Sequence, residues 1–271
     1  MLVYGIDFTS VPSRHNPITC SHCRIQDNVL IVTDLFPLND WNEFEDLLKD
    51  NGPWIAGIDF PFGQPKKLII NLNWAESWEE YVTYVSSLTK EEFEGLLTAY
   101  KNTRAYRDKE HRRITDVRAG SLSPMKLYGV PVGKMFFQGA KRLLRSDNSI
   151  VPCLRRESNR IVIEAYPGLA ARNLIRRESY KGNNGDQSRK LAARTNIISQ
   201  LEENRFRELY GFCVELRGNF KEKCIEDHGG DWLDAILCAV QAGWAYSQNN
   251  YGVPPDCDIN EGWIIDPSTR D

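Results

Sequence analysis

Short apolar runs that end at turn-forming residues predict the strands of this chain. Asp27-Asn28 separates two such runs and suits a tight β-hairpin. Another run ends at Phe60 and is stopped by Pro61, which lacks the backbone N–H that a strand needs. We therefore expect strands at residues 2–8, 17–25, 29–35, 53–60 and 160–166.

Apolar residues that recur every three or four positions predict helices between these strands. Asn39 or Asp40 suits the start of the first helix, and Thr89 with Glu92 fits a capping box. Residues 105–130 have weak periodicity and are expected to form an ordered loop, and the tail after residue 249 is expected to be mostly irregular. Helices are expected at residues 40–50, 66–72, 77–88, 89–104, 132–145, 169–178, 186–203 and 231–246.

The order of these elements predicts an α/β fold with a mixed sheet and flanking helices. An early hairpin is followed by helical connections, which are the crossovers that parallel strands need. A chain of 271 residues is long enough for one large domain. We expect a single domain over residues 1–271, with a mainly helical insertion at about residues 64–159.

Acidic residues follow three of the predicted strands. The word Gly-Ile-Asp-Phe occurs twice, with Asp7 in the first copy and Asp59 in the second, and Glu164 follows a third apolar run. The carboxyl ends of parallel strands meet at one edge of a sheet, where ligand sites form. Asp231 and Asp234 open the last helix and, being three residues apart, share one helix face. These five acids are the candidate catalytic residues.

Clustered carboxylates repel one another unless a cation lies between them. Carboxylate oxygens suit Mg²⁺ or Mn²⁺, and two such ions about 4 Å apart can promote phosphodiester hydrolysis. The same five acids are therefore the predicted ligands of two Mg²⁺ or Mn²⁺ ions. Each acid alone has a simpler explanation, because acids also cap helices and precede turns. Convergence of the acids in space would decide between the two explanations.

The net charge of −3 hides an uneven distribution of charge. Residues 101–194 carry 22 Lys and Arg against 8 Asp and Glu, a balance of +14, whereas the rest of the chain carries 12 against 29, a balance of −17. A basic segment favours an anionic partner such as DNA or RNA, although solvated helix faces would give the same count. The candidate substrate-binding residues are Arg104, Arg107, Lys109, Arg112, Arg113, Lys126, Lys134 and Lys181.

Composition argues against several other classes of protein. No apolar stretch approaches 18 residues, and the N-terminus lacks the pattern of a signal peptide, so we expect no membrane partner and a cytoplasmic location. Seven scattered cysteines suit a reducing compartment. Cys20 and Cys23 resemble half of a zinc site, but residues three apart in a strand face opposite sides, so packing is the favoured role.

Several segments together resemble a known family. They are "GIDFTS", "WIAGIDFPFG", "SPMKLYGVPVGKMFFQGAKRLL", "IEAYPG", "SYK" and "DWLDAILCAVQAGWA". The chain resembles an uncharacterised prokaryotic family of predicted ribonuclease H-like nucleases, filed as a domain of unknown function. The resemblance implies a ribonuclease H-like fold and metal ligands at Asp7, Asp59, Glu164 and the pair Asp231 and Asp234.

The function expected from these features is metal-dependent hydrolysis of phosphodiester bonds in nucleic acid. Two alternatives stay open. The chain could bind nucleic acid on an inactive nuclease-like scaffold, or it could be a phosphotransferase or phosphohydrolase that acts on a small phosphorylated substrate. The inactive scaffold would share every feature except the metal cluster, so convergence of the acids in space is the observation that discriminates it from a nuclease. A phosphotransferase would need a second domain to hold a nucleotide, and the chain is short for this and lacks Gly-rich phosphate-binding turns.

Overall fold

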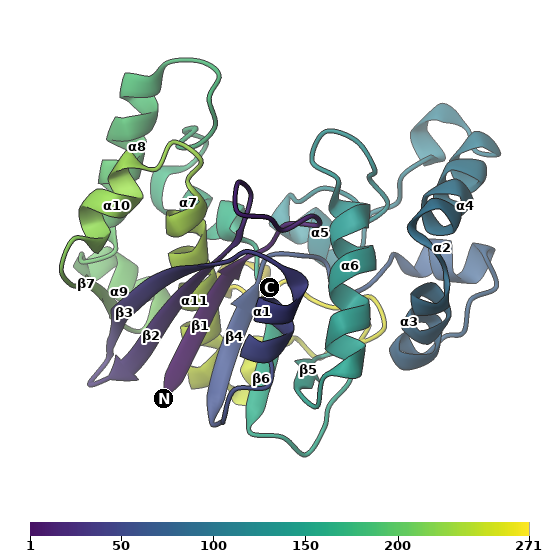
Figure 1. Cartoon of the computed structure of the whole chain (residues 1–271), viewed down its shortest axis with the longest axis horizontal. Coiled ribbons are helices and arrows are strands. Elements are labelled where there is room, and N and C mark those ends of the chain that lie inside the picture. The colour runs from purple at the N-terminus through teal and green to yellow at the C-terminus, as the bar shows by residue number, and fades with distance from the viewer. Residues whose placement is uncertain (271) are drawn as a thin grey trace.

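Seven strands form one mixed sheet within residues 1–270, the part of the chain that the computed structural model describes (Figure 1). Their order across the sheet is β5-β6-β4-β1-β2-β3-β7. The pairs β1–β2 and β2–β3 are antiparallel, and the other neighbours are parallel. The predicted α/β fold class with a mixed sheet is confirmed. The strands are β1 (Leu2–Asp7), β2 (Ile18–Gln26), β3 (Val29–Leu38), β4 (Trp54–Ile58), β5 (Ser149–Val151), β6 (Arg160–Glu164) and β7 (Cys213–Leu216).

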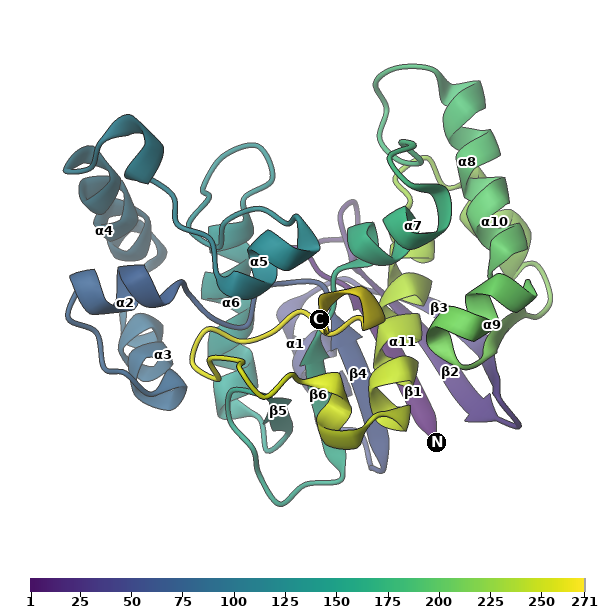
Figure 2. The same cartoon turned by 180° about the vertical axis from the view of Figure 1, so that it is seen from behind.

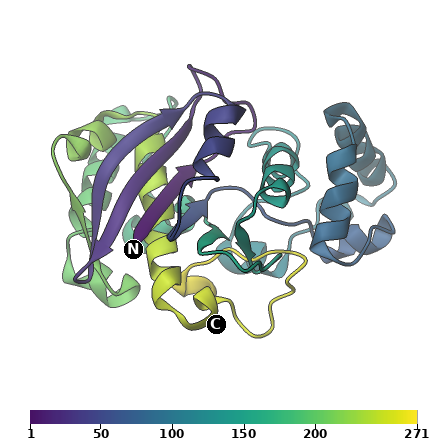
Figure 3. The ribbon, with the colours of Figure 1, turned by 60° about the horizontal axis from the view of Figure 1, so that its bottom comes forward.

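Helices cover both faces of the sheet (Figures 1 and 2). One core lies between the sheet and α7–α11, and the other lies between the sheet and α1 and α6. The helices α3 and α4 pack on α6, away from the sheet (Figure 3). The helices are α1 (Trp41–Leu47), α2 (Lys66–Asn71), α3 (Trp78–Ser87), α4 (Lys90–Asn102), α5 (Ile114–Ala119), α6 (Val132–Arg145), α7 (Pro167–Ile175), α8 (Gln187–Gln200), α9 (Asn204–Tyr210), α10 (Phe220–Glu226) and α11 (Asp231–Ser247). Short 3-10 turns lie at Tyr106–Asp108, Asn249–Gly252 and Pro267–Thr269.

The local signals read from the sequence are present in the structure. Asp40 caps α1 through two backbone N–H groups, and Thr89 and Glu92 form the expected capping box of α4. Asp27 and Asn28 adopt φ angles of 50° and 58°, the left-handed conformation that a type I′ hairpin turn requires. Cys20 and Cys23 of β2 belong to different cores, on opposite faces of the sheet.

Five short elements were not predicted, and they correct the sequence-based assignment. Residues 105–130 are not only a loop, because they contain α5 and a 3-10 turn. The helix α5 has six residues, too few to show a periodic pattern, and it ends at Gly120 in the left-handed conformation (φ 60°). The strands β5 and β7 have three and four residues and are defined by their pairing with β6 and β3. The short helices α9 and α10 were also missed.

The long helix α11 is buried on almost all sides and lies across β1, β2 and β4 (Figure 2). Its residues from Leu233 to Ala245 are buried. It therefore forms the centre of one core and places its first turn at the edge of the sheet where β1 and β4 end. Among the helices of residues 1–270, none combines the length and the apolar character that crossing a membrane requires.

Candidate active site

The two Gly-Ile-Asp-Phe segments lie side by side and in register. β1 and β4 are parallel, with Gly5 opposite Gly57, and the backbone N–H of Asp59 donates to the carbonyl of Ile6 over 2.9 Å. Asp7 and Asp59 therefore end neighbouring strands at the same depth. The repeated word thus marks two equivalent positions at one edge of the sheet.

The glycines of the repeat let α11 lie directly on the sheet. A Cβ atom at Gly5 would lie 1.9 Å from the carbonyl oxygen of Ala235, and one at Gly57 would lie 2.3 Å from that of Cys238. Alternate residues of a strand face the same side, so the aspartate two positions after each glycine also faces α11. Each Gly-Ile-Asp-Phe segment therefore supplies both the glycine that lets α11 pack closely and the aspartate that faces α11.

Asp234, in the first turn of α11, is the third acid at this position. Its side chain is fully buried, and it accepts a hydrogen bond from the Tyr180 hydroxyl at 2.5 Å. Its other oxygen forms an ion pair with the ammonium of Lys181, whose side chain remains 44% exposed. We call Asp7, Asp59 and Asp234 the acid cluster. Lys181 reaches the acid cluster from the solvent side and supplies a positive charge there.

Burial and mutual repulsion raise the pKa values of two members of the acid cluster, Asp59 and Asp7. Burial raises the pKa of Asp59 to about 7, with Asp234 adding to the rise and Lys181 opposing it. Burial also raises the pKa of Asp7 well above its usual range, reinforced by the charges of Asp234 and Asp59. Burial disfavours a charged Lys181, but the acids outweigh this effect and raise its pKa. The Lys181 ammonium therefore offsets only part of the negative charge that the three carboxyl groups carry when they are all ionised.

Glu164 faces the opposite side of the sheet. In the β4–β6 ladder it pairs with Ile58 and not with Asp59, and an offset of one residue turns a side chain to the other face. There Arg113 donates to the two Glu164 oxygens at 2.5 and 2.8 Å and to both oxygens of Asp116. Arg113, Asp116 and Glu164 are all buried. The structure thus brings Glu164 into an internal ion-pair network and not into the acid cluster.

Asp231 lies at the outer edge of the acid cluster. It is the first residue of α11, and its side chain is exposed overall. Partial desolvation of its carboxyl raises its pKa, with the charges of Asp227 and Asp234 adding to the effect. Asp231 is therefore close enough to interact electrostatically with the acid cluster, although it is not buried in it.

The donor chemistry of the acid cluster suits a divalent cation, because Mg²⁺ and Mn²⁺ prefer carboxylate oxygens. Across residues 1–270, however, no three His, Cys, Asp or Glu side chains are already gathered at the spacing of a metal site. Lys181 forms an ion pair with Asp234 instead, and the charges of Asp7 and Asp59 also act on its ammonium. Binding of a metal ion at this place would require the ammonium to leave and the carboxylates to close on the ion.

A cavity of about 240 Å³ opens beside the acid cluster, over the ends of β4 and β6. Asp59 and Lys181 line part of it, and the buried pair of Arg113 and Glu164 lines another part. The remaining wall is mostly apolar and consists of Phe60, Pro61, Leu122, Val130, Val132, Met135, Ala165 and Ile264, with Tyr166 and Ser121 among the polar members. A substrate group in this cavity would touch Asp59 directly.

Residues 29–258 match the protein family described as Protein of unknown function (DUF429). The match spans well over half of the chain. The chain belongs to the DUF429 family. Asp59, Glu164, Lys181 and Asp234 lie within the matched range, and Asp7 lies before it. No curated protein and no solved structure matches the chain.

The predicted substrate-binding residues of this DUF429 chain are not gathered in one groove beside the acids. Of the eight, Arg113 and Lys181 line the cavity, but the guanidinium of Arg113 is buried and its donors are engaged within the protein. The others are exposed or partly exposed: Arg107, Lys109 and Arg112 are exposed, Arg104 and Lys134 form ion pairs with Asp108 and Glu94, and Lys126 lies over the ring of Tyr128.

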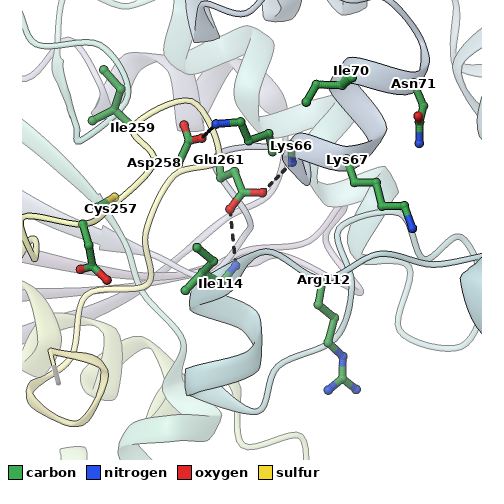
Figure 4. A pocket seen from close by; sticks show the side chains of 11 residues that line it. Lys66, Lys67, Ile70, Asn71, Arg112, Ile114, Cys257, Asp258, Ile259 and Glu261 are labelled. Carbon is green, nitrogen blue, oxygen red and sulfur yellow. Dashed lines mark hydrogen bonds and ion pairs between the residues drawn. The ribbon is translucent and has the colours of Figure 1, made fainter.

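Arg112 lines a separate, open groove between α2, the start of α5 and residues 256–261 (Figure 4). In this groove Lys66 pairs with Asp258 at 3.0 Å, and Glu261 accepts from the backbone N–H groups of Lys66 and Ile114. No residue of the acid cluster lines the groove. Lys67 and Asp256 pair with Asp108 and Arg118, which do not line the groove. The groove is therefore separate from the candidate active site.

Sequence reasoning missed three features of the site. Tyr180 precedes Lys181 in the chain, yet its bond to Asp234 depends on tertiary contact. Asp116 stands three residues after Arg113, a spacing typical of an ion pair within one helical turn, and this spacing could have marked the internal network. The apolar wall of the cavity comes from segments far apart in the sequence and carries no local signal.

Proposed function

We propose that this DUF429 protein is a metal-dependent nuclease that hydrolyses phosphodiester bonds of nucleic acid. The observation that carries the proposal is that Asp7 and Asp59 end neighbouring strands at the same depth on the side of α11, where Asp234 forms an ion pair with Lys181. The order of elements supports a ribonuclease H-like arrangement, since strand-borne acids on β1 and β4 are followed by an acid on a late helix. Burial, reinforced by repulsion between the acids, raises the pKa values of Asp7 and Asp59, and carboxyl groups perturbed in this way are typical of functional sites.

Asp7, Asp59 and Asp234 are the residues that would hold Mg²⁺ or Mn²⁺. A bound ion would supply an activated water and would stabilise the negative charge that develops on the leaving oxygen. The three acids suit one ion. The second ion of the expected pair would need Asp231 to turn inward, or Glu164 to exchange Arg113 for metal.

The remaining groups of the site position the acids and the substrate. The Tyr180 hydroxyl donates to one oxygen of Asp234 and fixes the orientation of that carboxylate. Lys181 is half-exposed and can turn from the acid cluster to a phosphate of the substrate, which keeps its charge compensated. Arg113 offsets one of the two negative charges that Glu164 and Asp116 carry when ionised in the floor of the cavity, and burial raises the pKa of Glu164, which reduces the charge that remains there.

A phosphohydrolase or phosphotransferase for a small phosphorylated substrate is the second candidate function. The observation in its favour is the small cavity beside Asp59, together with the dispersal of the basic residues over other surfaces. Binding of nucleic acid without cleavage is the third possibility.

The deciding experiment compares labelled DNA, RNA and hybrid substrates, and a panel of small phosphate esters, in Mg²⁺ and in Mn²⁺. We expect cleavage of a nucleic acid that Asp7→Asn reduces by about 100-fold or more. Asp147→Asn is the matched control, because the Asp147 side chain is 93% exposed and pairs with Arg160 at the start of β6, at the opposite end of the strands from Asp59. Hydrolysis of small esters alone would favour the second candidate, and binding without hydrolysis of any substrate would favour the third.

A further inference from the structure

We infer that the cavity beside Asp59 receives one unpaired base of the nucleic acid, so that the preferred substrate is a single strand or an unpaired end. This inference rests on the proposed function. The first argument is position. Asp59 of the acid cluster and Lys181 both line the cavity, so a base inside it would belong to a nucleotide whose phosphate lies at the cluster and Lys181.

The second argument is size. A cavity of about 240 Å³ is smaller than the roughly 300–1,000 Å³ of sites that enclose a whole small molecule. It suits one ring system and not a base pair. A base within a duplex is stacked and paired, and it would have to leave the duplex to enter such a space, at a cost that an unpaired base avoids.

The third argument is the chemistry of the wall. Leu122 and Val130 stand at the cavity with exposed fractions of 36% and 56%, and exposed apolar side chains at a concave site are typical of ligand contact. The polar groups of the floor are engaged already, since Arg113 binds Glu164 and Asp116 and the Ser121 hydroxyl donates to Asp116 at 2.8 Å.

These features predict recognition of a base by apolar contact and stacking, with little preference among the four bases. The floor offers few free donors or acceptors to read a base edge, whereas every base has an apolar face. Leu122 and Val130 at the rim are therefore the residues that distinguish an unpaired base from a paired one, because they would contact the apolar face of a base that has entered the cavity.

The test measures binding of short oligonucleotides, made as DNA and as RNA, to proteins that all carry Asp7→Asn so that the strand stays intact. The probes are a single strand with 2-aminopurine at its centre, the same strand with an abasic position there, and the duplex. We expect the intact single strand to bind about fivefold or more tightly than the abasic strand and the duplex, with a change in 2-aminopurine fluorescence.

The double substitution Leu122→Ala with Val130→Ala should weaken binding of the intact strand about fivefold or more and leave the abasic strand unaffected. Val117→Ala is the control, because Val117 is 64% exposed and does not line the cavity. Equal binding of the intact and abasic strands would overturn the inference and leave the proposed function standing. Base-dependent binding by a protein that cleaves no nucleic acid would overturn the proposed function alone, and no binding of any probe would overturn both.

Discussion

Replacing Asp59 by Asn should stabilise the metal-free protein, and the gain should grow with pH. Burial raises the pKa of Asp59 from its ordinary 3.8 to about 7. The unfolded chain therefore releases this proton near pH 4, whereas the folded protein keeps it until about pH 7. Between these two values the folded state binds more protons, so the free energy of unfolding of the parent falls as the pH rises.

The size of the effect follows from the difference between the two pKa values. Each pKa unit corresponds to about 1.4 kcal/mol, so Asp59 costs the folded protein about 4 kcal/mol above pH 7. Between pH 5 and pH 8 the free energy of unfolding of the parent should therefore fall by about 2–3 kcal/mol. The partial exposure of Asp59 and its interaction with Lys181 reduce the measurable fall to about 2 kcal/mol. Asn has a similar shape and does not titrate, so the variant should lack this loss.

The assay is urea unfolding at pH 5 and pH 8 in buffer with EDTA, followed by the fluorescence of the seven tryptophans. The difference in unfolding free energy between Asp59→Asn and the parent should be larger at pH 8, whereas Asp147→Asn should show no such change with pH. Added Mn²⁺ at pH 8 should stabilise the parent more than Asp59→Asn, because the metal replaces the missing positive charge. A stability difference that is the same at both pH values would refute the reasoning.

Three further substitutions test the surrounding structure. Arg113→Met should lower the free energy of unfolding by about 3–5 kcal/mol in urea titrations, because it leaves buried Glu164 and Asp116 unpaired; an unchanged midpoint would show that the network adds no stability. Gly57→Ala should lower the free energy of unfolding by about 2 kcal/mol or more, because the added Cβ would meet the α11 backbone. Gly95→Ala in α4, where nothing lies within 4 Å of the added Cβ, should instead stabilise the protein by up to about 1 kcal/mol. Equal melting temperatures for the two variants would contradict the close approach of α11 to Gly57. Lys181→Met should lower the melting temperature of the metal-free protein and enlarge the rise caused by Mn²⁺, and a smaller rise than in the parent would show that Lys181 does not occupy the cation position.

Local pattern in the amino-acid sequence was enough to predict several of the elements. The five strands with clear apolar runs, the hairpin turn at Asp27-Asn28 and the capped helices α1 and α4 all follow from residue spacing and turn chemistry, and these interactions lie within a few residues. The repeated Gly-Ile-Asp-Phe word also predicted parallel neighbours with aspartates at one depth, because equal words on parallel strands reach the same edge.

Which acids meet depends on the register of the sheet and on tertiary packing. Glu164 resembles Asp7 and Asp59 in the sequence, because it also follows an apolar run. In the sheet, however, Glu164 pairs with Ile58 and not with Asp59. Because side chains alternate between the two faces along a strand, this offset of one residue places Glu164 on the opposite face. The same holds for the cations. Lys181 and Arg113 look alike in a count of charge, yet one enters the acid cluster from solvent and the other is buried beneath the cavity. Composition and spacing specify which groups a chain carries, whereas the register of the sheet and the packing of α11 specify which of them share a site.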